Sequence, residues 1–429
     1  MSFSRGKILA WAVFLTAVLA LLVPVILIER QILAHTEGNP TLPQDESFIN
    51  IVVGKNLAFY GVWGLSKYAF VPAASSLLYP VALVPVFFIA GAHLVIPLLI
   101  NLIAAILLLR VVQRELLRRQ VAPTVQLAVL LLLIFLPPLP LLVVSGMEYS
   151  LFLLFTALFA RAFSRGLEED RLPTDVYVYA GLLVATRIEG FLLVAAACIV
   201  LGYQRQRITA VQPDYQRQRR SVILLASAAA LPVLLFGSLS FAKGGAFIPS
   251  ALLEPLGGGI YTAAIIGCAL VVVAFTYPYK RQWLASSLLG LIAIIRTGTL
   301  SADVIRTSID TYEQQVQAAR FVHRYYYRYG LSLNQPGILS YFSEGRKVDI
   351  TSVYSDSLSM QLGARMAIVT GAPSGVQPLS PRWGKVASWN NPGNSIFFYA
   401  SDTGTGRRLK ENLREYERRL PAGLRVRYY

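Results

Sequence analysis

Two acidic side chains stand next to each other in the polar stretch that follows the first apolar segment. They are Asp45 and Glu46, in the sequence Gln44-Asp45-Glu46. Adjacent carboxylates at such a position can belong to a solvated loop, ligate a divalent metal, or supply a general base together with its neighbour. The next residues, SFINIVVGKNLAFYG, are apolar enough to form a helix along a membrane surface. Such a helix would hold the two carboxylates close to the bilayer.

An arginine marks a second candidate site. Arg187 lies in LLVATRIEGFLLVAA, between two short apolar stretches, and Glu189 follows two residues later. Ionisable side chains at the depth of a membrane are costly, so they are candidates for function. The alternatives are an arginine that extends to lipid headgroups and a simple pair with Glu189.

Further charged side chains occur in the connections on either side of Arg187. Glu148 lies in SGMEYS, and Lys243 lies in FAKGGAFIPS, where glycines let the backbone approach a ligand closely. Lys67 is a further cation in the long polar stretch that contains Asp45. We take Glu148, Glu189 and Lys67 as supporting residues.

The composition indicates the solvent in which these residues work. Of 429 residues, 55% are hydrophobic and 14% are charged, and the mean hydropathy is +0.55. Soluble domains have about 25% charged residues, so the chain is expected to lie mainly in a bilayer. Basic residues exceed acidic ones, 39 against 23. We attribute this excess to the positive-inside rule, and we expect no nucleic-acid partner. The two cysteines and three scattered histidines suggest neither a disulfide framework nor a metal cluster.

Apolar runs predict an α-helical polytopic membrane protein with about 9–11 spans and an odd total. The run from 77 to 109 is long for one crossing and tight for two, so we expect a break near Ala90-Gly91-Ala92. The apolar runs are Ile8–Ile28, Leu77–Leu109, Val125–Val144, Tyr149–Phe163, Val176–Thr186, Phe191–Tyr203, Val222–Leu239, Ile260–Tyr277 and Trp283–Ile295.

The connections between the runs alternate between basic and nearly uncharged. Those assigned to the cytoplasmic side carry 16 basic residues, and those assigned outside before the tail carry five. This bias places Asp45, Glu148, Arg187 and Lys243 together on the extracytoplasmic side. We therefore expect them to converge in one pocket there.

The composition changes to that of a soluble protein at about residue 296. We divide the chain into a transmembrane domain, 1–298, with a long outer loop at 30–76, and a small extracytoplasmic α/β domain, 299–429. Periodicity predicts a helix over Asp310–Tyr329 and a turn at Asn334–Gly337. MAIVTG, SIFFYAS and GLRVRYY are expected to form strands, and RRLKENLREYERRL a helix.

Several motifs together resemble the GT-C glycosyltransferases of bacteria, among them arabinofuranosyltransferase-like and mannosyltransferase-like members. DESFINIVVGKNLAFYG resembles the acidic pair and helix of their first outer loop, and FVPAASSLLYP their small-residue and proline patch. SGMEYSLFLL and ATRIEGFLL are similar to their Gly-Leu-Glu and Arg-Pro-Glu-Gly turns, and FAKGGAFIPSALLEP to a later loop. The tail segments NQPGILSYFSEGRKVDITSV and ENLREYERRLPAGLRV resemble the outer domain of arabinofuranosyltransferase-like members.

The resemblance implies an inverting enzyme of the bacterial cytoplasmic membrane that takes a sugar from a polyprenyl-phosphate donor. Asp45, with Glu46 beside it, would supply the general base, and Arg187 and Lys243 would bind the donor phosphate. The acceptor would be a glycan, lipid or protein; a divalent metal is possible, but no metal site is assigned.

Departures from the family pattern leave alternatives open. Ile188 stands where the family has proline, Glu46 where a second aspartate is common, and Gln335 precedes Pro336-Gly337 instead of the more usual aspartate before the glycine. The alternatives are a lipid or sugar transporter, and a non-catalytic assembly subunit whose outer domain binds glycan. Transporters gather polar groups near mid-membrane, whereas these charges lie at the ends of the apolar runs. In the tail, Trp383, Trp389 and Tyr325–Tyr327 would permit sugar stacking or form a core.

Overall fold

The protein, described here by a computed structural model, divides into two compact units. The first unit comprises Met1–Arg30, Ser75–Val81 and Val95–Asp303, and the second comprises Gln31–Ala74, Ala82–Leu94 and Val304–Tyr429. Most of the long loop that the sequence assigns to the membrane domain therefore belongs to the same unit as the C-terminal residues. The structure describes residues 5–169, 171–206, 213–247, 300–345, 347–349, 364–371, 382–390, 395–421 and 424–429.

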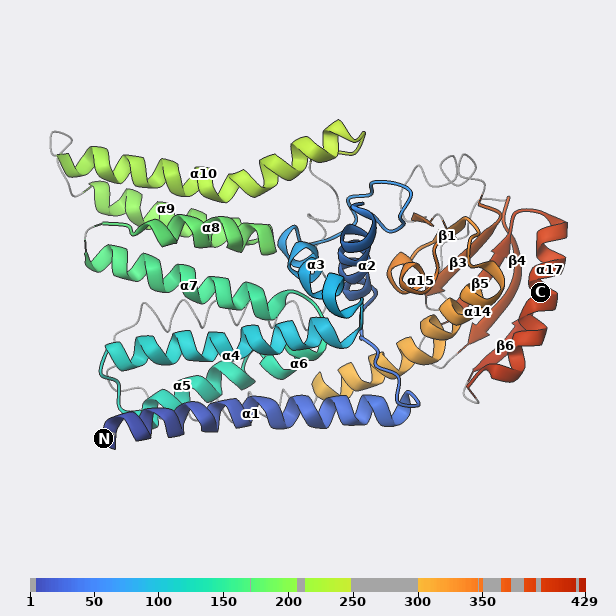
Figure 1. The fold of residues 1–429 in the computed structure, drawn as a ribbon, viewed down its shortest axis with the longest axis horizontal. Helices are drawn as coiled ribbons and strands as arrows, with labels where there is room; N and C mark the ends of the chain where they lie inside the picture. The colour runs from blue at the N-terminus through green and yellow to red at the C-terminus, as the bar shows by residue number, and fades with distance from the viewer. Residues whose placement is uncertain are drawn as a thin grey trace. The chain divides into compact units, whose positions relative to one another are not determined.

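Helices make up the first unit. Helix α4 packs on α7, α7 on α8, and α8 on α10, and Figure 1 shows these helices running alongside one another. The helices are α1 (Arg5–His35), α4 (Val95–Arg118), α5 (Pro123–Phe135), α6 (Leu139–Val144), α7 (Tyr149–Glu168), α8 (Thr174–Thr186), α9 (Gly190–Gln206) and α10 (Pro213–Ala242), and α3 (Leu78–Ala90) begins in this unit.

Four stretches of the described helices are long and apolar enough to cross a membrane: Gly6–His35, Val95–Arg118, Tyr149–Glu168 and Arg219–Ala242. Shorter apolar helices cover Leu78–Ala90, Pro123–Phe135, Thr174–Thr186 and Gly190–Gly202. Large apolar side chains lie on the surface of these helices, for example Leu192 and Ile199, which are 74% and 71% exposed. These features are consistent with a membrane protein. The total of 9–11 spans stays a prediction, since the runs 260–277 and 283–295 lie outside the described residues.

Two of the predicted apolar runs are each divided between two helices. The break expected near Ala90-Gly91-Ala92 is present, because α3 ends at Ala90 and Gly91 has a left-handed φ of 83°. The run from 125 to 144, predicted as one span, is also divided, between α5 and α6. Pro137 and Pro138 lie at this break, and proline cannot donate the backbone hydrogen bond that a continuous helix needs.

Two basic connections of the first unit, those after α4 and after α7, share one end of the bundle. Arg118, at the end of α4, contacts Glu168 at the end of α7, with 2.8 Å between nitrogen and oxygen. Arg165 near the same end of α7 contacts Asp175 in the first turn of α8, at 2.9 Å. The alternating charge pattern requires these connections to lie together, as they do. Which side of a membrane they face stays a prediction.

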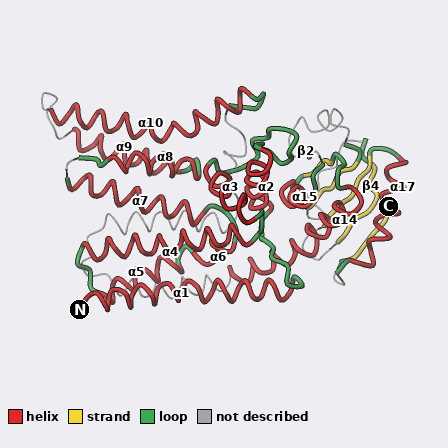
Figure 2. Tube along the Cα trace, in the orientation of Figure 1, coloured by secondary structure: helices red, strands yellow, loops and turns green. Residues whose placement is uncertain are grey.

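A six-stranded mixed sheet lies in the second unit, in the order β2-β1-β3-β5-β4-β6. Strand β1 pairs in parallel with β2 and β3, and the remaining pairs are antiparallel. Figure 2 shows the strands in yellow beside the red helices of this unit. The strands are β1 (Leu331–Leu333), β2 (Lys347–Asp349), β3 (Met366–Gly371), β4 (Gly384–Asn390), β5 (Ser395–Ala400) and β6 (Arg425–Tyr428). The helices are α2 (Asp45–Tyr60), the π-helix Thr311–Val316, α14 (Gln317–Tyr326), α15 (Pro336–Phe342), α17 (Thr403–Tyr416) and the 3-10 turn Glu417–Arg419.

An aromatic core joins this sheet to its helices. The ring of Phe321 on α14 lies 6.0 Å from Trp389 on β4, 5.8 Å from Phe398 on β5 and 5.5 Å from Tyr416 on α17. Helices α14 and α17 therefore cover the same face of the sheet. The predicted strands β3, β5 and β6 and the predicted helices are confirmed, whereas β1, β2 and β4 were not predicted.

Candidate functional site

Among the predicted site residues of the first unit, Arg187 lies buried between two carboxylates. The Arg187 Nη1 donates to Glu148 Oε1 at 2.7 Å, and its Nη2 donates to Glu189 Oε1 at 2.8 Å. The guanidinium also lies 5.2 Å from the centre of the Tyr149 ring. The Arg187 side chain is 4% exposed and that of Glu148 0%. We call these four residues the Arg187 cluster.

Two chain turns position this cluster. Arg187 follows α8 in an extended conformation, and Gly190 N–H donates to the Arg187 carbonyl as α9 begins. Glu148 directly precedes α7, after a turn in which Gly146 has a φ of 71°. That turn is fixed from α3 and α4, because Tyr79 Oη donates to the Gly146 carbonyl and Asn101 Nδ2 to that of Met147. The two turns thus hold opposite charges in contact.

Burial and charge act against each other inside the cluster. Burial raises the pKa of Glu148, and attraction to Arg187 opposes this rise. Burial alone would lower the pKa of Arg187, but the charge of Glu148 and the hydrogen bonds to Glu189 raise it above its ordinary value. Three N–H groups of Arg187 donate to these two carboxylates: Nη1 to Glu148, and Nε and Nη2 to Glu189.

Asp45, the predicted general base, begins α2 in the second unit and contacts the start of α15. Its Oδ2 accepts from Gly337 N–H at 2.9 Å and its Oδ1 from Ile338 N–H at 2.8 Å. The first amides of a helix have no partner within the helix, and its positive end favours a carboxylate. Glycine is required at 337, because a Cβ there would collide with the backbone oxygen of Asp45. The side chain that caps α15 therefore comes from 292 residues earlier in the chain.

This arrangement keeps Asp45 buried and accepting two hydrogen bonds. A carboxylate is a group that can take up a proton, so the base role of Asp45 stays a prediction. Glu46, its neighbour in the first turn of α2, is partly exposed. Asp45 belongs to the second unit and Arg187 to the first. One pocket formed by both residues stays a prediction.

The two predicted lysines have different surroundings. In the second unit, Lys67 Nζ lies 2.6 Å from Glu344 Oε2. This hydrogen bond raises the pKa of Lys67 and lowers that of Glu344. In the first unit, Lys243 is exposed immediately after α10. Across the described parts of the chain, no three His, Cys, Asp or Glu side chains lie close enough together to hold a metal ion.

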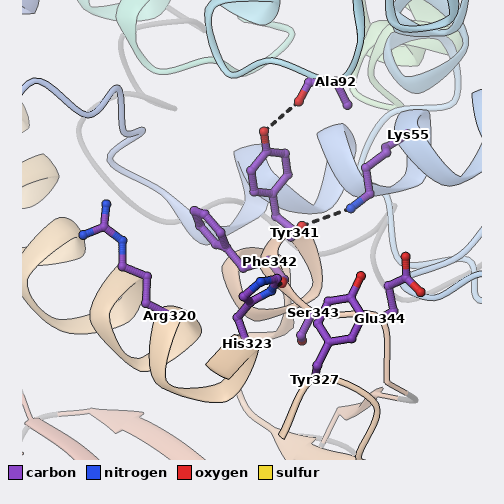
Figure 3. Close-up of a pocket in the computed structure, with 9 residues that line it drawn as sticks. All are labelled: Lys55, Ala92, Arg320, His323, Tyr327, Tyr341, Phe342, Ser343 and Glu344. Atoms are coloured by element: carbon purple, nitrogen blue, oxygen red, sulfur yellow. Dashed lines mark hydrogen bonds between the residues drawn. The ribbon is translucent and has the colours of Figure 1, made fainter. Parts of the chain in front are cut away.

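The structure adds a cavity of about 380 Å³ in the second unit, which the sequence analysis did not anticipate. Residues of α2, α14 and α15 line it, as Figure 3 shows. Lys55 Nζ donates to the Tyr341 carbonyl at 3.0 Å, and Tyr341 Oη donates to the Ala92 carbonyl at 2.6 Å. Two partial signals for this site are present in the sequence. One is Tyr327 in the run Tyr325–Tyr327, and the other is the pair of segments DESFINIVVGKNLAFYG and NQPGILSYFSEGRKVDITSV, which contain Lys55 and Tyr341–Glu344. Trp383 and Trp389, the other aromatic candidates, are buried in the domain.

The comparisons with known proteins add no family to this description. No family model matches the chain, and no curated protein or solved structure is significantly similar to it. The resemblance to the membrane glycosyltransferases therefore rests on the short motifs alone.

Proposed function

We propose that the protein is a membrane glycosyltransferase that moves a sugar from a polyprenyl-phosphate donor to an acceptor outside the cytoplasm. The observation that carries the proposal is the Arg187 cluster, a buried guanidinium held at the junction of apolar helices. A membrane bundle does not need such a group for stability, since ion pairs in apolar surroundings contribute little net free energy. A lipid-linked phosphate is the kind of ligand that a planar guanidinium at this position suits.

The proposed reaction needs a base and cations. The acceptor hydroxyl oxygen attacks the anomeric carbon, and its proton passes to Asp45. The bond between that carbon and the phosphate oxygen breaks, and its electron pair stays on the polyprenyl phosphate. Arg187 and Lys243 stabilise the charge that develops on the phosphate. One carboxylate with direct attack gives inversion at the anomeric carbon.

The partners of Arg187 suggest how the donor would enter. Because burial favours the neutral form of Glu148, an arriving phosphate can replace this carboxylate as the partner of Arg187 while Glu148 holds a proton. Glu189 is partly exposed, with 23% of its side chain accessible, and it can turn away without leaving a buried charge. After either change, protonation of Glu148 or rotation of Glu189, the donor phosphate gives Arg187 a negatively charged partner.

The experiment is a transfer assay with the purified chain in lipid nanodiscs and radiolabelled polyprenyl-phosphate arabinose or mannose. Asp45→Asn should abolish transfer while leaving the protein folded. Asp402→Asn is the matched control, because Asp402 also accepts a backbone N–H at a helix start, that of Thr405 at 2.8 Å, but is exposed. Full activity of Asp45→Asn would contradict the proposed base.

The cavity of the second unit favours one alternative, a non-catalytic subunit that binds glycan. That alternative predicts saccharide binding without transfer from either lipid-linked donor. Loss of transfer in Arg187→Lys with saccharide binding unchanged would favour the enzyme, because a lysine cannot reproduce the two-sided contact of a guanidinium.

A further inference from the structure

The cavity of the second unit has the size and walls of a small-ligand site. Its volume of about 380 Å³ lies within the range of ligand pockets in proteins, roughly 300–1,000 Å³. Tyr327, Tyr341, Phe342 and His323 supply aromatic rings, and the rings of His323 and Tyr327 lie 4.9 Å apart. The negative face of an aromatic ring attracts polarised C–H groups, such as those on the face of a sugar ring.

Positive charge exceeds negative charge around the cavity. Lys55 lies over the Tyr341 ring at 5.2 Å, and one of its three N–H groups donates to the Tyr341 carbonyl. Burial lowers the pKa of Lys55, and the nearby charge of Glu344 opposes this effect. The carboxylate on the wall, Glu344, already pairs with Lys67. An anion beside Lys55 would stabilise the ammonium.

Further hydrogen-bonding groups complete the wall. His323 Nδ1 donates to the Phe342 carbonyl at 2.6 Å, which leaves Nε2 for a hydrogen bond with a ligand. Ser343 donates to the Leu339 carbonyl, and its oxygen can still accept. Figure 3 shows the rings of Tyr341, Phe342 and His323 at the centre, with Lys55 and Glu344 on one side and Arg320 on the other. The aromatic rings are therefore flanked by a cation, Lys55, and by groups that can accept hydrogen bonds from ligand hydroxyls.

We propose that this cavity binds an acidic saccharide, meaning a sugar that carries a carboxylate or a phosphate. The acidic group pairs with Lys55, one face of the sugar ring packs on the aromatic wall, and hydroxyl groups donate to His323 and Glu344. This proposal does not rest on the transferase activity. A protein that binds acidic saccharides in this cavity but transfers no sugar, or that transfers sugar but binds none in this cavity, would show that the two proposals are independent.

The test measures binding of four probes to the purified full-length chain by calorimetry: glucuronate, glucose 6-phosphate, glucose and inorganic phosphate. Both acidic sugars should bind at least about tenfold more tightly than glucose or phosphate alone, since a charged hydrogen bond adds to the ring contact. Lys55→Gln should weaken binding of the acidic sugars by about tenfold and leave binding of glucose unchanged. Lys410→Gln, on α17, is the matched control and should change nothing.

A second variant keeps the test decisive if Lys55→Gln fails to fold because Lys55 is partly buried. His323 is exposed, so His323→Ala should fold and should weaken every sugar probe by several-fold, with no effect on phosphate. Two results would overturn the proposal. One is acidic sugars that bind no more tightly than glucose. The other is phosphate that binds as tightly as glucose 6-phosphate, which would indicate an anion site only. Preference for glucuronate or for glucose 6-phosphate identifies the acidic group.

Discussion

Glu148 and Asp45 are both buried carboxylates, but the protein compensates their charges in different ways. Glu148 contacts a side-chain cation, Arg187, which lies 39 residues away in the same helical unit. Asp45 accepts two backbone N–H groups at the start of α15, in the unit that contains the sheet. The pair of Glu148 and Arg187 needs both side chains to be present and ionised, whereas the contact of Asp45 needs the backbone of α15 to stay in position. Removing the charge of Arg187 should therefore destabilise the surroundings of Glu148, and displacing α15 should destabilise those of Asp45.

The largest effect is expected from Arg187→Gln. This change leaves Glu148 buried without its countercharge, which should cost about 3–5 kcal/mol of unfolding free energy. Denaturant unfolding of the purified protein in detergent measures it, with Arg427→Gln on exposed β6 as the control. The double variant Arg187→Gln, Glu148→Gln should regain much of the loss. A double variant as unstable as the single one would contradict the unpaired charge of Glu148 as the cause of the loss.

Gly337→Ala should have the next largest effect. A Cβ at this position collides with the backbone of Asp45, so α15 must move and should lose about 1–3 kcal/mol. Gly404→Ala is a matched control, because Gly404 also lies in the first turn of a helix and its Cβ would come no nearer than 3.4 Å to Asp402 Oδ1. Equal thermal stability of the two variants would show that the contact between Asp45 and Gly337 is loose.

Two substitutions of Asp45 test its role as the acceptor for the first N–H groups of α15. Asp45→Ala leaves two helix N–H groups without an acceptor, at a cost of about 1–2 kcal/mol. Asp45→Asn keeps one oxygen and should lose roughly half as much. Thermal melts of both variants give the order. If Asp45→Asn is less stable than Asp45→Ala, the capping role is wrong.

The smallest effect is expected at the partly exposed pair of Lys67 and Glu344. The hydrogen bond lowers the pKa of Glu344 below its ordinary 4.5, so its contribution is complete above that pH and is lost as the pH falls through the lowered value. Glu344→Gln should therefore reduce stability slightly at neutral pH and leave it unchanged in strong acid. Melts of both proteins at neutral and acidic pH test this. If the difference in melting temperature between the original protein and Glu344→Gln grows as the pH falls, the predicted pH dependence is wrong.

Local patterns predicted many of the elements correctly. MAIVTG and SIFFYAS are short, continuous apolar runs, which is the pattern of a strand buried on both faces, and they identify β3 and β5. The helical spacing before Tyr329 identifies α14, which is long enough to show its period. Strands β1 and β2 have three residues each, too few to show any period. The division at Pro137 and Pro138 was missed because the apolar run continues through the two prolines.

The candidate site was predicted less completely, for a different reason. The contact between Glu148 and Arg187 follows from their positions at the same end of the predicted spans, so the sequence brought them near each other. The contact between Asp45 and α15, and the cavity around Lys55, join residues almost 300 positions apart. No local pattern in a single sequence encodes such pairs. Long-range contacts of this kind also place Gln31–Ala74, most of the predicted loop 30–76, in one compact unit with Val304–Tyr429.

The distance along the chain between Asp45 and Gly337 has a consequence for biosynthesis. The ribosome makes α2 long before it makes α15, and at about 5–20 residues per second the delay over 292 residues is roughly 15–60 s. Throughout that interval Phe48 and Ile51, which are buried in the finished protein, lack the surface that will cover them. Transiently exposed apolar surface favours aggregation, so a lipid surface or a chaperone would protect α2 until α15 is translated.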